Sequence, residues 1–207
     1  MVSKDPFAVD SLSAALAYHS LGWSIIPIAA NKKTPALKSW KPFQTRRADE
    51  QQIRDWYDKR DDLGLAVVLG AVSGGLTCRD FDDEAAYHAW AAQNPDLAKT
   101  LPTARTGRGF HVYFVSDLDH TDKLGDGELR GKGAIVVLPP SEHSSGVQYR
   151  WIIPPSGSPH GLIFGGFKVQ NLQRDRAMIW LLCLRLRSEE HRLNSSHPRL
   201  SRMPSSA

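Results

Sequence analysis

A short segment of this chain ends in two carboxylates: Leu76-Thr77-Cys78-Arg79-Asp80-Phe81-Asp82. Its length, its apolar residues and the Gly74-Gly75 pair before it are typical of a buried β-strand. Because side chains in a strand alternate between the two faces, Asp80 and Asp82 are expected on the same face. Two neighbouring carboxylates repel each other unless a cation lies between them, so the pair predicts a divalent metal site. A solvated strand end is the alternative interpretation.

Predicted helices and strands alternate around this segment, which indicates a chain of mixed helix and sheet, assigned here to the α+β class. Helices are expected at 11–21, 49–58 and 83–92, with Asp10 or Ser11 capping the first and Asp83 capping the third. Strands are expected at 23–28, 64–69, 75–80, 110–115, 134–138 and 147–152.

Composition narrows the protein class. The 207 residues can form one substantial core, and no apolar stretch reaches the roughly 20 residues that span a bilayer. The two cysteines, Cys78 and Cys183, do not have the spacing of a zinc site or of a disulfide framework. A cytoplasmic protein without membrane partners is expected.

The net charge of +4 does not by itself indicate a polyanionic partner. It is concentrated after residue 167, where 8 Lys and Arg face 3 acids, whereas 1–167 is close to neutral. We expect a folded domain over 8–165, a linker or helix over 166–186, and a non-native, disordered tail over 187–207. The Ser- and Arg-rich tail has no amphipathic period, and the folded chain is expected to be truncated on its C-terminal side.

A second segment of chemical interest is Thr106-Gly107-Arg108-Gly109-Phe110-His111. Gly107 and Gly109 allow the backbone to approach a ligand, while Arg108 and His111 offer groups that bind phosphate. The segment suits a triphosphate, and a hairpin turn is the simpler alternative.

A third segment is Gly127-Glu128-Leu129-Arg130-Gly131-Lys132-Gly133, which precedes an apolar strand. Glu128 supplies a third carboxylate, and Arg130 and Lys132 supply positive charge. A hairpin is again the alternative, but polar glycine-bearing segments at several strand ends favour a shared ligand site.

Taken together, the motifs resemble the bifunctional DNA primase/polymerase N-terminal domain of the archaeo-eukaryotic primase superfamily, which is found in plasmids, phages and mobile elements. The resemblance covers about residues 8–165. It rests on Lys33-x-Pro35, Trp40, Asp80-x-Asp82, Thr106-Gly107-Arg108-Gly109-x-His111, Arg130-Gly131-x-Gly133 and Pro139-Pro140-Ser141-x-His143-x-x-Gly146-x-x-Tyr149-x-Trp151.

The resemblance implies an N-terminal α/β unit packed on a unit similar to the RNA-recognition fold, with the active site between them. It implies that Asp80, Asp82 and Glu128 hold Mg²⁺ or Mn²⁺ and catalyse nucleotidyl transfer, although aspartate is more usual than Glu128 at the third place. It also implies that His111 contacts the phosphates of the incoming nucleotide. We also expect four residues to assist in binding the nucleoside triphosphate: the basic Arg108, Arg130 and Lys132 through their charge, and Gly109 through the close approach that its backbone allows.

Single-stranded DNA is the expected template. Between Lys32 and Arg47 the chain has six basic residues and no acid, interleaved with aromatic residues. We assign Lys33, Lys38 and Trp40 to template binding, with a solvated loop as the alternative. The resemblance also implies a partner outside this chain, a helicase or a helical priming domain. A metal-dependent nuclease or phosphodiesterase, and a catalytically silent nucleic-acid-binding module, remain as other function classes.

Overall fold

The computed structural model describes residue 7 and residues 10–156. The expectations for the segments 157–165, 166–186 and 187–207 fall outside the described residues. In chain order the elements are α1 (Ser11–Ser20), β1 (Ser24–Ile28), η1 (Lys41–Gln44), α2 (Glu50–Tyr57), β2 (Gly64–Val68), η2 (Ala71–Ser73), β3 (Leu76–Phe81), α3 (Glu84–Gln93), α4 (Pro95–Thr100), β4 (Thr103–Arg105), β5 (Phe110–Val115), β6 (Thr121–Leu124), β7 (Gly127–Arg130), β8 (Ile135–Val137) and β9 (Arg150–Ile153).

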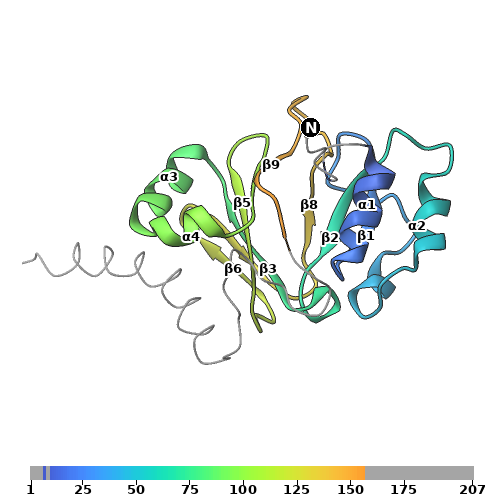
Figure 1. The fold of residues 1–207 in the computed structure, drawn as a ribbon, viewed down its shortest axis with the longest axis horizontal. Coiled ribbons are helices and arrows are strands. Elements are labelled where there is room, and N and C mark those ends of the chain that lie inside the picture. Colours follow the sequence, from blue (N-terminus) through green and yellow to red (C-terminus); the bar gives the residue numbers. More distant parts are fainter. Residues whose placement is uncertain (1–6, 8–9, 157–207) are drawn as a thin grey trace, which may run out of the picture.

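The strands form two antiparallel sheets. One has the order β1-β2-β8, and the other has the order β6-β7-β3-β5-β4-β9. The chain passes from the small sheet to the large one after β2, returns for β8, and crosses again for β9. In Figure 1, α1 and α2 lie at one end of the view and α3 and α4 at the other, with the strands between them. These repeated crossings tie the two sheets into one unit, and the α+β class is confirmed.

Aspartate caps begin the three longest helices. The side chains of Asp10, Asp49 and Asp83 each accept a hydrogen bond from the backbone N–H three residues later. Each bond satisfies a donor that the first helical turn cannot pair within itself. The left-handed Gly22 (φ 86°) follows the C-cap residue Leu21 and ends α1, a position that favours glycine. The helices at 11–21, 49–58 and 83–92 are therefore confirmed to within a residue or two.

Aromatic side chains join the two sheets. The Trp23 ring, beside β1, stacks with Tyr18 of α1 at 5.3 Å and lies 6.0 Å from Tyr113 of β5. The Tyr18 hydroxyl donates to the Pro139 carbonyl at 2.9 Å and accepts a hydrogen bond from Trp151 Nε1 at 2.7 Å. The space between the small sheet and β5 and β9 is thus filled and hydrogen-bonded.

The other face of the large sheet is covered by α3. Phe81 of β3 contacts Tyr87 and Trp90, and the Tyr87 ring stacks on Phe110 at 4.0 Å. Because neighbouring strand residues face opposite ways, Phe81 pointing toward α3 directs Asp80 to the face opposite α3. The hydrophobic contacts beneath α3 therefore fix the direction in which the first carboxylate points.

The strands expected at 64–69 and 75–80 form as β2 and β3, which belong to different sheets. The hairpin considered as the alternative for the segment around Glu128 is present, and Glu128 lies on its second strand, β7. The strand expected at 147–152 begins only at Arg150, because the preceding residues form a turn held by the bond from His143 N to Val147 O.

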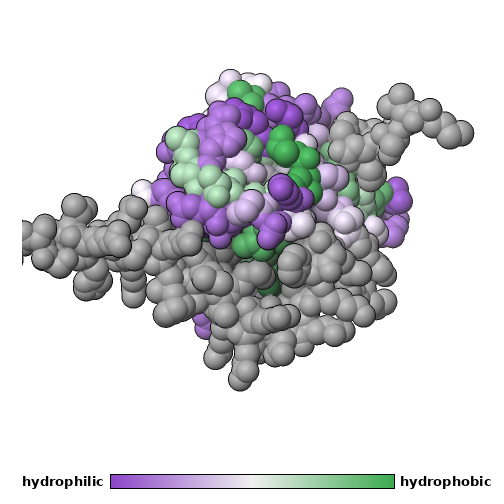
Figure 2. Space-filling view, turned by 60° about the vertical axis from the view of Figure 1, so that its left-hand side comes forward, coloured by the Kyte–Doolittle hydropathy of each residue, from purple (hydrophilic) through white to green (hydrophobic). Residues whose placement is uncertain are grey.

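None of the helices in the described part of the chain has the length and apolar character that a membrane span requires. On the face seen in Figure 2, hydrophilic residues surround small hydrophobic areas.

Candidate active site

Asp80 lies at the centre of the site because β3 is flanked by two strands that each carry a chemically active residue. In the β-sheet register, Asp80 is paired with His111 of β5 on one side and with Glu128 of β7 on the other. Residues directly opposite each other in antiparallel strands share a face. Three sequence segments that are far apart in the chain thus bring an imidazole and two carboxylates together, with His111 Nε2 at 3.3 Å from Asp80 Oδ1.

Arg130 joins the two carboxylates. It lies two residues after Glu128 on β7, and therefore on the same face. Its Nη2 atom is 3.1 Å from Asp80 Oδ2 and 2.9 Å from Glu128 Oε2. The Nη1 atom donates to the Ile135 carbonyl at 3.3 Å. Each oxygen of Asp80 thus faces a different basic group.

These neighbours decide the charge of Asp80. Its side chain is only 14% exposed, and burial by itself would raise the pKa of the carboxyl. The effects of His111, Arg130 and Lys33 outweigh burial and lower the pKa of Asp80 to about 2. Asp80 is therefore a carboxylate at neutral pH.

The His111 ring is held between two protein groups. Its Nδ1 atom is 3.3 Å from the Tyr113 hydroxyl, while Nε2 faces Asp80. Burial raises the pKa of Tyr113 well above its usual value, so its hydroxyl stays protonated. The ring is therefore oriented in advance, and a phosphate can bind to Nε2 only by sharing it with Asp80 or replacing Asp80.

Asp82 follows the last residue of β3 and is far more exposed than Asp80. Its side chain is 63% exposed, and its Oδ1 atom is 4.0 Å from Arg108 Nη2. Arg108 is itself mostly exposed. Surface ion pairs of this length hold their partners weakly, so both groups can turn toward a ligand.

In the turn before β5, Gly109 has a structural role, which differs from the ligand-binding role expected from the sequence. Its N–H donates to Thr106 Oγ1 at 3.0 Å, and a Cβ atom at this position would collide with the Phe81 carbonyl. The absence of a side chain thus lets the turn approach β3, rather than leaving this N–H open toward a ligand.

Lys33, expected to bind the template, also acts electrostatically on residues of this site. Its positive charge is among the causes that lower the pKa of Asp80. Burial, and after it the charges of Lys33 and Arg108, lowers the pKa of His143. A pocket of about 320 Å³ lies here, and its lining comprises Asn31, Lys32, Lys33, Thr34, Val137, Glu142, His143, Ser144 and Tyr149.

His143 and Tyr149 belong to the motif that ends at Trp151, but the sequence alone did not indicate a role for them. The His143 ring packs against Gly107, where an added Cβ would lie 2.6 Å from the ring. Tyr149 lies between the two imidazoles, with ring centroids 5.9 Å from His111 and 6.1 Å from His143. The spacing Ser141-x-His143…Tyr149 was the available signal, but it does not reveal that the residues meet His111.

In the described part of the chain, the remaining expected site residues form no ion pair with Asp80. The charge of Lys132 acts on Asp119, and no ion pair between described residues joins Lys132 to Asp80 or Glu128. Lys38 is exposed. Trp40 is partly buried against the core just before η1. These three residues are not brought into the Asp80 cluster.

Oxygen donors for a divalent cation are present, but they are not assembled. Among the described residues, no three His, Cys, Asp or Glu side chains are arranged to hold a metal ion. Asp80 and Glu128 nevertheless converge on one positive group, the Arg130 guanidinium. Carboxylate oxygens suit Mg²⁺ and Mn²⁺. The pair therefore fits such an ion, with the exposed Asp82 as the nearest further carboxylate in sequence.

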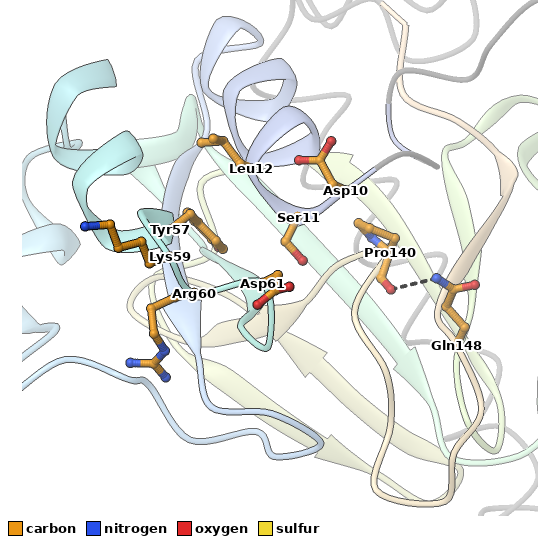
Figure 3. A pocket seen from close by; sticks show the side chains of 9 residues that line it. All are labelled: Asp10, Ser11, Leu12, Tyr57, Lys59, Arg60, Asp61, Pro140 and Gln148. Atoms are coloured by element: carbon orange, nitrogen blue, oxygen red, sulfur yellow. Dashed lines mark hydrogen bonds between the residues drawn. The ribbon is translucent and has the colours of Figure 1, made fainter.

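A larger pocket of about 630 Å³ lies elsewhere, between the start of α1, the end of α2 and the segment after β8. Figure 3 shows the charged ends of Lys59 and Arg60 turned away from Pro140 and Gln148. Asp10 caps α1 and Arg60 forms two hydrogen bonds with Asp62. Because Asp10 and Arg60 already have partners in the protein, and because the carboxylates and the imidazole converge at Asp80, we place the candidate active site at Asp80 and not in this pocket.

Comparison with protein families gives a match that covers most of the chain. Residues 15–161 match the family described as "Bifunctional DNA primase/polymerase, N-terminal". The matched range includes β3, β5, β7 and the residues that line the smaller pocket. A search of curated proteins gives no significant match.

Proposed function

Because the chain belongs to the bifunctional DNA primase/polymerase N-terminal domain family, we propose that it is a nucleotidyltransferase that adds nucleotides to a primer or nascent strand on single-stranded DNA. The observation that supports this most strongly is the row of His111, Asp80 and Glu128 on three adjacent strands, with Arg130 between the carboxylates.

Asp80, Glu128 and Asp82 are the residues that would hold Mg²⁺ or Mn²⁺. When bound, such ions activate the attacking 3′-hydroxyl and neutralise charge on the transferred phosphate. The low pKa of Asp80 supports this assignment, because the residue is ionised throughout the neutral range. Its burial also limits competition from water for the carboxylate.

Basic groups around the carboxylates would bind the triphosphate. Arg108 and Arg130 offer the forked donors that suit phosphate oxygens, and His111 offers Nε2. Lys33 joins this group in our proposal, since its charge reaches both Asp80 and His143. Phosphoryl transfer depends mainly on positioning and charge stabilisation, which such a set of residues can supply.

Template binding is proposed for the segment between Lys32 and Arg47, where Lys38 is exposed and Trp40 is partly exposed. Lysines would contact phosphates, and the indole would stack on a base. In this arrangement Lys33 would lie where the template segment meets the triphosphate site. A helicase or helical priming domain outside this chain remains a proposed partner.

Primer extension on single-stranded DNA, with Mg²⁺ or Mn²⁺ and with either ribonucleotides or deoxyribonucleotides, tests the proposal. We expect extension by the wild-type chain and a loss of at least about 100-fold in Asp80→Ala/Asp82→Ala, since removal of charge-stabilising groups has effects of this order. The matched control is Asp58→Asn, which changes an exposed carboxylate at the end of α2.

The rival functions give different outcomes. A silent binding module would retain DNA binding but show no extension by the wild-type chain. A nuclease or phosphodiesterase would degrade the primer and would not bind deoxynucleoside triphosphates in the presence of Mn²⁺. Either result would overturn the proposed function.

A further inference from the structure

The position of Arg130 is unusual for a residue that serves only to bind phosphate. Its Nη2 atom lies within 3.1 Å of Asp80 Oδ2 and 2.9 Å of Glu128 Oε2. A divalent cation shared by the two carboxylates through these oxygens would compete with the guanidinium for them. The guanidinium therefore already bridges the carboxylates that a divalent ion would share.

The interactions of Arg130 in this position are incomplete. Its Nε atom is buried and has no hydrogen-bond partner, and the contact from Nη1 to the Ile135 carbonyl is long, at 3.3 Å. A buried donor without a partner costs free energy, which is recovered if the side chain moves to a site where the donor is satisfied. The side chain remains 27% exposed, so a route toward solvent is open.

The charges around Asp80 predict that a divalent ion and the Arg130 guanidinium compete for the carboxylates. Asp80 and Glu128 offer two carboxylate groups, and Arg130 already places one positive charge between them. An ion of charge +2 beside the guanidinium would experience strong repulsion at such short range. A triphosphate provides an alternative partner for the released guanidinium, with phosphate oxygens matched to its donors.

We propose that Arg130 is a built-in counter-ion of Asp80 and Glu128, which a divalent cation displaces and which then binds the triphosphate. The inference rests on the proposed function, because it concerns the same site. The consequence is that metal and nucleotide bind cooperatively. The metal alone binds weakly because Arg130 must first leave the carboxylates. The nucleotide supplies the new partner that Arg130 needs once it has left. Premature loading of the site by the metal alone is thereby disfavoured.

Mn²⁺ binding without nucleotide tests this directly, using electron paramagnetic resonance on the full chain. In Arg130→Gln we expect Mn²⁺ to bind at least about tenfold more tightly than in wild type, because a competing positive charge has been removed. Arg130→Lys, which restores the charge, should return the affinity toward the wild-type value. Addition of Asp80→Asn to Arg130→Gln should abolish the gain, which would locate the ion at this site.

A static role in phosphate binding predicts a different pattern. In that case Arg130→Gln would weaken binding of dATP but leave the affinity for Mn²⁺ alone unchanged, and the inference would be overturned. Arg130→Met, which keeps the aliphatic stem, is measured in parallel in case Gln perturbs the hairpin. Arg54→Gln removes one exposed positive charge from α2 and controls for the change in net charge.

The result separates this inference from the proposed function. If wild type extends primers but the Mn²⁺ affinities of wild type and Arg130→Gln agree, only the counter-ion inference fails. If wild type neither binds dATP nor extends primers, the proposed function fails, whatever the Mn²⁺ measurement gives.

Discussion

Asp80 is the residue at which burial and charge compete most directly. Burial opposes its ionisation, yet His111, Arg130 and Lys33 keep its pKa at about 2. A carboxyl in the unfolded chain has a pKa of about 3.9. Because the folded value is lower, the ionised side chain stabilises the fold above pH 4, and this contribution is lost as the pH falls through 2.

This shift predicts a pH-dependent effect of Asp80→Asn. The difference in pKa corresponds to about 2.6 kcal/mol, of which about 2 kcal/mol is lost between pH 6 and pH 2. As the pH rises from 2 to 6, the wild type should therefore gain about 2 kcal/mol of unfolding free energy relative to Asp80→Asn. Urea unfolding of both proteins at several pH values provides the measurement. A difference that does not vary with pH would contradict the assigned role of the neighbouring cations.

At this scale the sequence identified chemical groups better than it identified their contacts. Asp80, His111, Glu128 and Arg130 could be selected because carboxylates, imidazole and guanidinium groups occur together in ligand sites and these four lie in segments near strand ends. Their meeting depends on the register of β3 with β5 and β7, which no local pattern specifies.

The β6–β7 hairpin determines where Glu128 lies, and a buried arginine attaches this hairpin to β3. Arg79 is 2% exposed and forms an ion pair with Asp126, which is in the hairpin turn. Its Nη1 atom also donates to the Asp80 carbonyl at 2.7 Å, and the guanidinium lies 4.0 Å from the centre of the Phe81 ring. Arg79 thus holds the hairpin in the register that pairs Glu128 with Asp80.

We predict that Arg79→Met lowers the unfolding free energy by about 3 kcal/mol. Methionine retains part of the packing on Phe81 but leaves Asp126 and the Asp80 carbonyl without a charged donor. Denaturant unfolding measures the loss. Arg54→Met is the matched control, because its exposed pair with Glu50 should contribute less than about 0.5 kcal/mol. Equal losses in the two variants would show that Arg79 does not hold the hairpin.

The three longest helices could be predicted at this scale because their start signals are local, whereas α4, which has no side-chain cap, was not expected. An aspartate cap followed by apolar spacing is read within one turn. The short elements could not be found in this way: β6 has the sequence Thr-Asp-Lys-Leu and alternates between exposed and partly buried residues, while β4 has only three residues. Both are strands because a neighbouring strand supplies their hydrogen bonds, which is a property of the fold and not of the segment.

For the whole molecule, the sequence indicated a single core but not how two sheets share it. The strands that surround Asp80 belong to one sheet, while Lys33 follows a strand of the other. The two parts of the site therefore stay aligned only if the sheets do not move apart. The hydroxyl of Tyr18 lies at this junction, with Pro139 after β8 and Trp151 on β9 as its partners.

Tyr18→Phe tests how strongly this junction holds the sheets together. The change keeps the stacked ring but removes the hydroxyl, so the buried Pro139 carbonyl and Trp151 Nε1 lose this partner. We expect a loss of about 1–3 kcal/mol in unfolding free energy, while circular dichroism and tryptophan fluorescence still report a single shared transition. Ser20→Ala removes a hydroxyl from an exposed bond on the same helix and should cost much less. If the two signals separated in Tyr18→Phe, the sheets would be independent units joined mainly by this contact, and the alignment of Lys33 with Asp80 would depend on one hydroxyl group.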